Sequence, residues 1–217
     1  KDAKIMLSSD IKTDSRILYY RNITERIRRA TPFLSLDQDP YMVISDSGKL
    51  YWMVDAYTVS THLPYSRRLR NRVNYMRNSV KITVDAYNGA IRYYLSDPDD
   101  PIAKVYSAMF PGLFQDLDAM PEDLRKHIRY PKDIFKTQVA LYATYHMSDP
   151  KTFYNKEDLW EIPSYGDKSM DPYYLIMKIP GEKNEEYVLL APYTPAKRDN
   201  LAAWFAARCD TPNYGRL

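Results

Sequence analysis

Cysteine and glycine are scarce in this sequence. Cys209 is the single cysteine among 217 residues, so no disulfide can form within the chain, and the count fits either the cytosol or export. The 6 glycines form no loop of the kind that cradles a phosphate or a dinucleotide, and no Gly-x-Ser-x-Gly elbow presents a serine nucleophile. These absences argue against nucleotide hydrolysis and against an elbow-type serine hydrolase.

Long apolar runs and a strong net charge are also lacking. Pro, Asn or a charged residue interrupts each hydrophobic stretch well before the roughly 20 residues that a membrane-spanning helix needs. Lys and Arg total 31 against 28 Asp and Glu, and a net charge of +3 is too small to indicate a polyanion partner for the whole surface. We therefore expect a soluble chain with no nucleic-acid partner and no cofactor.

Tyrosine is abundant, with 21 residues, and this favours sheets and interfaces in which a ring packs while its hydroxyl stays hydrated. Period-2 alternation between turn residues predicts strands, and helical spacing behind capping residues predicts helices. The predicted hairpins cover residues 41–57, 80–95 and 173–191, and the predicted helices lie near residues 13–31, 101–109, 122–129, 131–147 and 196–208.

Strands and helices are therefore grouped in blocks and do not alternate as βαβ units. This order predicts an α+β fold in which helices pack on antiparallel β-hairpins. The length suits a single domain over residues 1–217, with a subdivision into a hairpin-rich part (1–96) and a helical part with the third hairpin (97–217) as the alternative. Because the chain starts at Lys1 without a leader, we expect it to be a fragment of a longer protein.

One acidic cluster has the density of oxygen ligands that a hard cation requires. Asp97, Asp99 and Asp100 lie within four residues, interrupted by Pro98 and followed by Pro101. Such a cluster could bind calcium. The alternative is that Asp100 caps the helix that Pro101 begins, and we favour it because further ligands and a tight glycine turn are missing.

His146 and Asp149 form the most chemically suggestive stretch, with Ser148 between them. An imidazole near a hydroxyl and a carboxylate could act as a general base. The same residues stand where a long helix ends and Pro150 starts the next turn, so structural roles are the favoured interpretation.

A basic segment precedes the second hairpin. Its arginines could bind phosphate groups, and the interleaved Tyr65 and Tyr75 could stack on rings. The alternative is a solvated loop whose charges pair with acids elsewhere. The candidate anion-binding residues are Arg67, Arg68, Arg70, Arg72 and Arg77.

Many short stretches spread along the whole chain resemble one protein family. They are Arg21-Asn22-Ile23, Asp39-Pro40-Tyr41, Leu50-Tyr51-Trp52, Arg77-Asn78-Ser79, Phe110-Pro111-Gly112, Tyr145-His146-Met147 and Glu157-Asp158-Leu159-Trp160. Together they are similar to the soluble region of large bacterial multi-pass membrane proteins that are grouped among the uncharacterised protein families. The resemblance implies that about seven transmembrane helices precede a large region outside the cytoplasmic membrane. It implies no catalytic residue or ligand.

A second resemblance is local. Residues 80–91 look like the hairpin of small PepSY-type extracytoplasmic modules, in which a strand ends in Asp-Ala before a glycine turn. Any hairpin of this length needs similar turn residues, so the resemblance bears on the fold alone.

Three functional hypotheses remain at this point. The first is a non-catalytic extracytoplasmic binding or scaffold domain of a membrane protein, whose partners are the transmembrane part of the same protein, other envelope proteins or a second copy. The second is a hydrolase-like enzyme domain acting on envelope material through His146 and Asp149. The third is an anion-binding module that uses Arg67 to Arg77.

Overall fold

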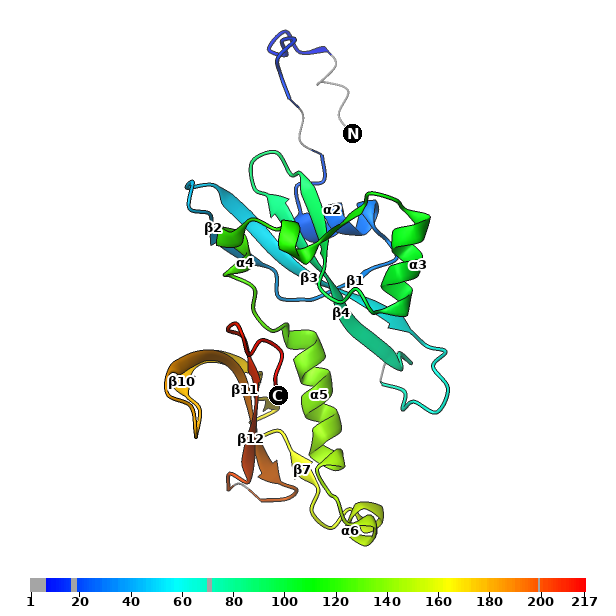
Figure 1. Ribbon diagram of the computed structural model, residues 1–217, viewed down its shortest axis with the longest axis vertical. Coiled ribbons are helices and arrows are strands. Elements are labelled where there is room, and N and C mark those ends of the chain that lie inside the picture. The colour runs from blue at the N-terminus through cyan, green and yellow to red at the C-terminus, as the bar shows by residue number, and fades with distance from the viewer. Residues whose placement is uncertain (1–6, 17–18, 70–71, 199) are drawn as a thin grey trace.

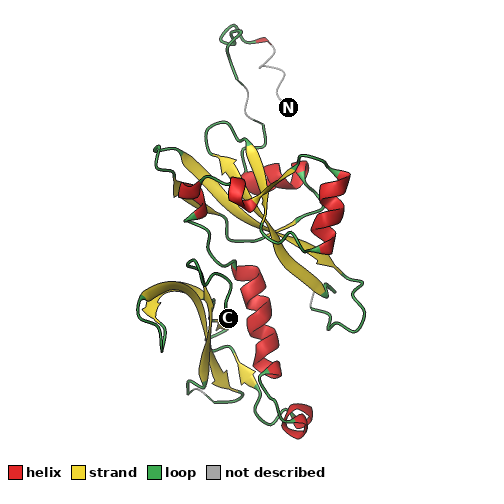
Figure 2. Cartoon of the chain, in the orientation of Figure 1, coloured by secondary structure: helices red, strands yellow, loops and turns green. Residues whose placement is uncertain are grey.

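The computed structural model describes residues 7–16, 19–69, 72–198 and 200–217 (Figure 1). Its chain folds around two β-sheets that lie one beyond the other along the long axis of the molecule, with helices packed against each (Figures 1 and 2). The α+β fold with mainly antiparallel sheets that the sequence predicts is thereby confirmed.

The first sheet has six strands and contains two of the three predicted hairpins. Strands β3, β4 and β5 are antiparallel neighbours, β1 and β2 pair with the two ends of β3, and β6 runs parallel to β5. Gly48 and Gly89 close the two hairpin turns at φ +77° and +69°, a region that favours glycine. The strands are β1 (Ser35–Leu36), β2 (Tyr41–Ile44), β3 (Leu50–Ser60), β4 (Tyr75–Asp85), β5 (Ile91–Leu95) and β6 (Phe114–Asp116).

Helices cover both faces of the first sheet. On one face, α2 (Ile23–Ala30) and α3 (Pro101–Met109) pack over alternate strand residues that include Val54, Val80 and Ile82. On the other face, η1 (Leu117–Ala119) and α4 (Glu122–Arg125) bury Met53 and Tyr94. Because both faces are covered, the polar side chains that alternate with the apolar ones are buried as well.

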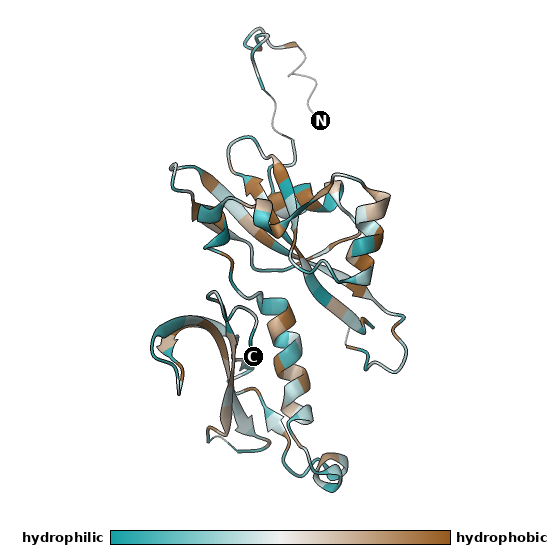
Figure 3. Cartoon of the chain, in the orientation of Figure 1, coloured by the Kyte–Doolittle hydropathy of each residue, from teal (hydrophilic) through white to brown (hydrophobic). Residues whose placement is uncertain are grey.

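The second sheet is smaller and is covered by one long helix. Strand β11 (Glu185–Pro195) pairs with β10 (Tyr173–Lys178), β12 (Ala203–Arg208) and, at its end, β7 (Trp160–Glu161). Helix α5 (Lys132–Tyr145) carries an apolar and a polar side (Figure 3) and buries Phe135 and Val139 against Leu189 and Tyr193. The remaining elements are α6 (Pro150–Asn155) and the short pair β8 (Ser164–Tyr165) and β9 (Lys168–Ser169).

The first helix that the sequence predicts corresponds to α2 and is shorter in the structure. It begins at Ile23, where the Asn22 side chain accepts the N–H of Glu25 at 3.1 Å, and not behind Thr13 to Ser15. Tyr20 adopts φ +50°, a left-handed conformation that cannot continue a right-handed helix. Ile17, part of the predicted stripe, lies outside the described residues. The helix expected near 122–129 likewise ends early, at Arg125.

The helix predicted over residues 196–208 is wrong. Residues 203–208 form strand β12, because pairing with β11 outweighs the helical propensity of its alanines. Phe205 and Ala207 point toward α5, while Trp204 points away from it. Leu201 and Trp204, expected to be buried, are 63% and 41% exposed.

Candidate functional site

The structure places His146 and Asp149 at two different helix ends. His146 follows the last turn of α5, where its Nδ1 lies 3.0 Å from the carbonyl oxygen of Tyr142 and its ring stacks on Trp160 at 3.6 Å between centroids. Asp149 accepts the N–H of Thr152 at 2.8 Å and so caps α6; this bond lowers the pKa of its carboxyl. Both side chains therefore have helix-terminal partners.

A carboxylate approaches the other nitrogen of His146 from Asp158. Its Oδ2 lies 3.6 Å from Nε2, which is longer than a hydrogen bond, and the Asp158 side chain is 61% exposed. His146 Nε2 is buried and has no hydrogen-bond partner among the described residues. Asp149, the acid that the sequence suggested, is not the one that approaches the imidazole.

The carboxylate of Asp100 is buried and occupied by protein donors. It accepts the N–H of Ile102 at 3.0 Å, as a helix cap does, and the hydroxyls of Ser79 and Tyr75 at 2.6 Å each; Thr58 donates a further bond. Burial alone would raise the pKa of this carboxyl, but the four hydrogen bonds outweigh it and the pKa is lowered. Asp100 is thus an ionised cap in the interior.

Asp97 and Asp99 form ion pairs at the surface. Asp97 pairs with Arg77 at 2.9 Å, and Asp99 pairs with Lys104 at 3.3 Å. Within the described ranges, no group of three or more His, Cys, Asp or Glu side chains is arranged to hold a metal ion.

The predicted basic segment divides into two parts. Arg77 lies in β4, where it pairs with Asp97. Arg67, Arg68 and Arg72 lie in the exposed loop between β3 and β4, and Arg70 lies outside the described residues. The structure therefore does not bring all five arginines into one site.

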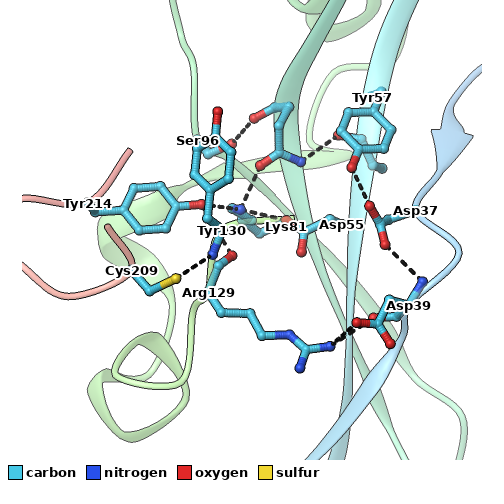
Figure 4. A network of polar contacts seen from close by, with 12 residues as sticks. Asp37, Asp39, Asp55, Tyr57, Lys81, Ser96, Arg129, Tyr130, Cys209 and Tyr214 are labelled. Atoms are coloured by element: carbon cyan, nitrogen blue, oxygen red, sulfur yellow. Dashed lines mark hydrogen bonds and ion pairs between the residues drawn. The ribbon is translucent and has the colours of Figure 1, made fainter. Parts of the chain in front are cut away.

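Sequence reasoning missed a large polar cluster, which is buried where the two sheets meet (Figure 4). Lys81 of β4 pairs with Asp55, its cross-strand neighbour on β3, and both side chains are almost fully buried. The ammonium also donates to Asn78 Oδ1 at 2.6 Å and to the hydroxyl oxygen of Tyr214, near the C-terminus, at 2.7 Å. Three acceptors therefore satisfy its three hydrogens.

Further hydrogen bonds tie the loop between β1 and β2 to the start of α5. Tyr57 donates to Asp37, whose Oδ2 also accepts the N–H of Asp133 at 3.0 Å. In the opposite direction, the Asp133 carboxylate accepts a hydrogen bond from the N–H of Gln38 at 3.0 Å. The loop of the first sheet and the first turn of the helix on the second sheet thus hold each other reciprocally.

Arg129 completes the connection, in the segment that joins the sheets. Its guanidinium donates to Asp39 at 2.8 Å and lies 3.9 Å from the ring centre of Tyr41 and 4.5 Å from that of Tyr174. An arginine sandwiched between a ring from each sheet adds cation–π attraction to the ion pair. We call this cluster the inter-sheet network: Asp37, Asp39, Asp55, Tyr57, Asn78, Lys81, Arg129, Asp133 and Tyr214.

The protonation state of Lys81 decides whether the inter-sheet network could act as a nucleophile or base. Burial by itself would lower the pKa of Lys81, but the Asp55 carboxylate and the Tyr214 oxygen outweigh burial and raise that pKa above its usual value. Burial raises the pKa of Tyr214 to about 12. Lys81 is therefore a fixed cation with no lone pair for nucleophilic or base chemistry, and the network is suited to holding the sheets together.

A signal for this network was present in the sequence. Lys81 alternates with Val80 and Ile82, which predicts that it points to the opposite face of the sheet, and it does. What alternation cannot show is that the second sheet and the C-terminal segment cover that face. Aligning the hairpins places Asp55 opposite Lys81, and this pairing was the available clue.

One small cavity lies at the far end of the first sheet, between the residues preceding α2 and the turn after β4. Its volume is about 240 Å³, and its lining includes Tyr19, Tyr20, Trp52 and Tyr87. Arg26 donates to the carbonyl oxygens of Gly89 and Tyr19, both at 2.7 Å. A shallower and more open hollow of about 600 Å³ adjoins it across Tyr19, Tyr20 and Arg26, and none of the predicted site residues lines either one.

Comparison with known proteins gives a consistent result. The model of the family described as Uncharacterised protein family (UPF0182) matches residues 1–217. A UPF0182 protein of Geotalea uraniireducens (strain Rf4) is 64% identical over 99% of the chain, and one of Geobacter sp. (strain M21) is 62% identical over all of it. The chain spans 24% of the length of each of these relatives. No solved structure matches it.

Among the described residues, no helix has both the length and the apolar character needed to cross a membrane.

Replacing Lys81 tests the network. Lys81→Ala leaves Asp55 buried without a counter-charge, so we expect a loss of about 3–5 kcal/mol in the free energy of unfolding, measured by urea denaturation. The matched control is Lys104→Ala, which breaks an exposed pair and should cost less than about 1 kcal/mol. The double variant Lys81→Met with Asp55→Leu should recover most of the loss. Equal effects of Lys81→Ala and Lys104→Ala would contradict the structural role.

The lowered pKa of Asp100 predicts that its contribution to the free energy of unfolding depends on pH. Because its pKa is lower in the folded than in the unfolded chain, its contribution is complete above the unfolded value of about 3.9 and is lost as pH falls through the folded value. Asp100→Asn should therefore destabilise the protein at pH 6, and the difference from wild type should shrink as pH falls toward 2. Urea denaturation across this range measures it, and a difference independent of pH would show that the ionised form contributes nothing.

Proposed function

The chain belongs to the Uncharacterised protein family (UPF0182), and on that premise we propose that it is a non-catalytic binding and scaffold domain on the extracytoplasmic side of a larger multi-pass protein of the bacterial cell membrane. The observation that carries the proposal is an apolar face of the second sheet that no helix covers. The membrane location rests on the sequence resemblance described above.

The uncovered face follows from strand register. Leu189, Ala191 and Tyr193 of β11 point toward α5, so the alternate residues point the other way. Pairing continues this face onto both neighbours, because Leu190 lies opposite Tyr173 of β10 and Ala206 of β12. We call its apolar part the open face: Tyr173, Leu175, Val188, Leu190, Trp204 and Ala206. Beyond Val188 the same side of the sheet becomes charged, where Arg208 pairs with Glu186.

The open face has the composition of an interface. Val188 and Leu190 form a buried floor, and Tyr173 and Trp204 stand beside them with 41% of each residue exposed. Aromatic residues around an apolar centre are enriched where proteins bind one another. Figures 1 and 2 show α5 on one side of the second sheet and no helix of the described chain on the other. The apolar surface that stays exposed on this side is that of Tyr173 and Trp204, and exposed aromatic side chains beside a buried apolar floor favour an occupant.

The occupant that we propose is the remainder of the same polypeptide. The chain covers 24% of the relatives that it matches, so most of each relative lies outside the matched region. A scaffold has to present its docking surface at a fixed orientation, and the inter-sheet network provides this by joining the two sheets through buried charges.

Cysteine labelling tests location and docking together. Lys49→Cys sits in the exposed turn between β2 and β3, and Trp204→Cys sits on the open face. Native Cys209 is buried and burial raises its thiol pKa to about 11, so it should stay unlabelled. In intact cells that carry the full-length protein, a membrane-impermeant maleimide should label Lys49→Cys but not Trp204→Cys. In the isolated 217-residue chain it should label both.

The two parts of the proposal fail differently. If neither cysteine reacts until the cells are broken, the extracytoplasmic location is wrong. If Trp204→Cys reacts as fast as Lys49→Cys in the full-length protein, the open face is free and the docking proposal is wrong.

A further inference from the structure

The loop between β3 and β4 carries positive charge with no acid of its own. From Ala56 to Val84 the sequence contains no Asp or Glu, whereas Arg67, Arg68, Arg70 and Arg72 fall within six positions. We call residues 61–69 and 72–74 the basic loop; Arg70 and Asn71 lie outside the described residues and are not part of it.

The stem of the basic loop is ordered by its own hydrogen bonds. The Asn74 side chain accepts the N–H of Leu63 at 3.1 Å and donates to its carbonyl oxygen at 2.7 Å. Ser66 donates its hydroxyl to the carbonyl oxygen of Asn74 at 2.7 Å. These bonds fix the position from which the loop projects beyond the end of the first sheet (Figure 1).

The loop presents apolar and cationic side chains together. Tyr65 is fully exposed and Leu63 is 44% exposed. Arg67, Arg68 and Arg72 are exposed, and within the part of the chain that the structure describes none of them forms an ion pair. The exposed side chains therefore combine three guanidinium groups with an aromatic ring and an aliphatic group.

We infer that the basic loop binds the anionic lipid head groups of a membrane surface. Guanidinium groups bind lipid phosphates, and each basic residue near an anionic leaflet adds to the attraction. Tyrosine favours the membrane–water interface because its ring is apolar and its hydroxyl is polar. Tyr65 and Leu63 enter the head-group region while the three arginines hold the surrounding phosphates.

A lipid surface fits these residues better than a nucleic acid does. Single-stranded nucleic acids are bound along grooves in which successive bases stack on several rings. The basic loop offers one fully exposed ring at a projecting position and an exposed leucine, which has no role in base stacking. The inference rests on the proposed membrane location, although the binding itself can be measured on the isolated chain.

The test is sedimentation of the 217-residue chain with lipid vesicles. We expect binding to vesicles of phosphatidylcholine with about one-third phosphatidylglycerol, weakening as salt rises, and none to phosphatidylcholine alone. Replacing Arg67, Arg68 and Arg72 together by Ala should weaken binding about a hundredfold. The matched control replaces Arg28, Lys151 and Lys183 by Ala, which removes the same charge from exposed positions elsewhere and should leave binding close to wild type.

A dye reports whether the loop enters the lipid. Tyr65→Cys, labelled with an environment-sensitive fluorophore, should show a blue shift with the anionic vesicles and none with inorganic polyphosphate. The same dye on Lys49→Cys, at the opposite end of β3, should show no shift with either. Thermal unfolding and circular dichroism confirm that each variant folds.

Three results would overturn the inference: no vesicle binding, equal loss in the control triple variant, or binding to polyphosphate without any Tyr65→Cys shift on vesicles. These outcomes leave the cysteine-labelling test of location and docking unaffected, so the two proposals can fail separately.

Discussion

The ion pair between Lys81 and Asp55 is the contact on which the arrangement of the two sheets depends. Moving two charges out of water costs several kcal/mol for each ion, and their attraction offsets this only when the remaining donors and acceptors are satisfied. Asn78 supplies one acceptor from the same strand, but Tyr214 supplies the other from the second half of the chain. The first sheet can bury its lysine at low cost only while the second sheet is in place, so the two halves stabilise each other.

The parts of the fold that the sequence predicts are those fixed by local chemistry. Gly48 and Gly89 specify the hairpin turns, and Asp100 before Pro101 specifies a helix start. The parts that it does not predict depend on distant partners. Ala203 to Arg208 become a strand because β11 is beside them, and the acceptor that completes Lys81 is 133 residues away in the sequence. No periodicity along one segment contains that information.

The same division applies to function. The residues that sequence reasoning selected, His146, Asp149 and the acidic cluster at Asp97 to Asp100, serve helix ends and ion pairs. The open face and the basic loop, which the structure adds, depend on how the strands pair with one another. The open face exists because strands β10, β11 and β12 align their apolar residues on the side away from α5. The basic loop follows β3 at the end opposite the turn that joins β2 to β3, and the inter-sheet network links the sheet that carries the loop to the sheet that carries the open face.

The most direct test of this coupling is native-state hydrogen exchange on the isolated chain. If the inter-sheet network joins the halves, the central amides of β4, around Ile82, and those of β11, around Leu189, should exchange through the same global opening with equal free energies. If the amides of β11 exchange several kcal/mol more easily than those of β4, the second sheet opens independently and the network does not unite the two sheets.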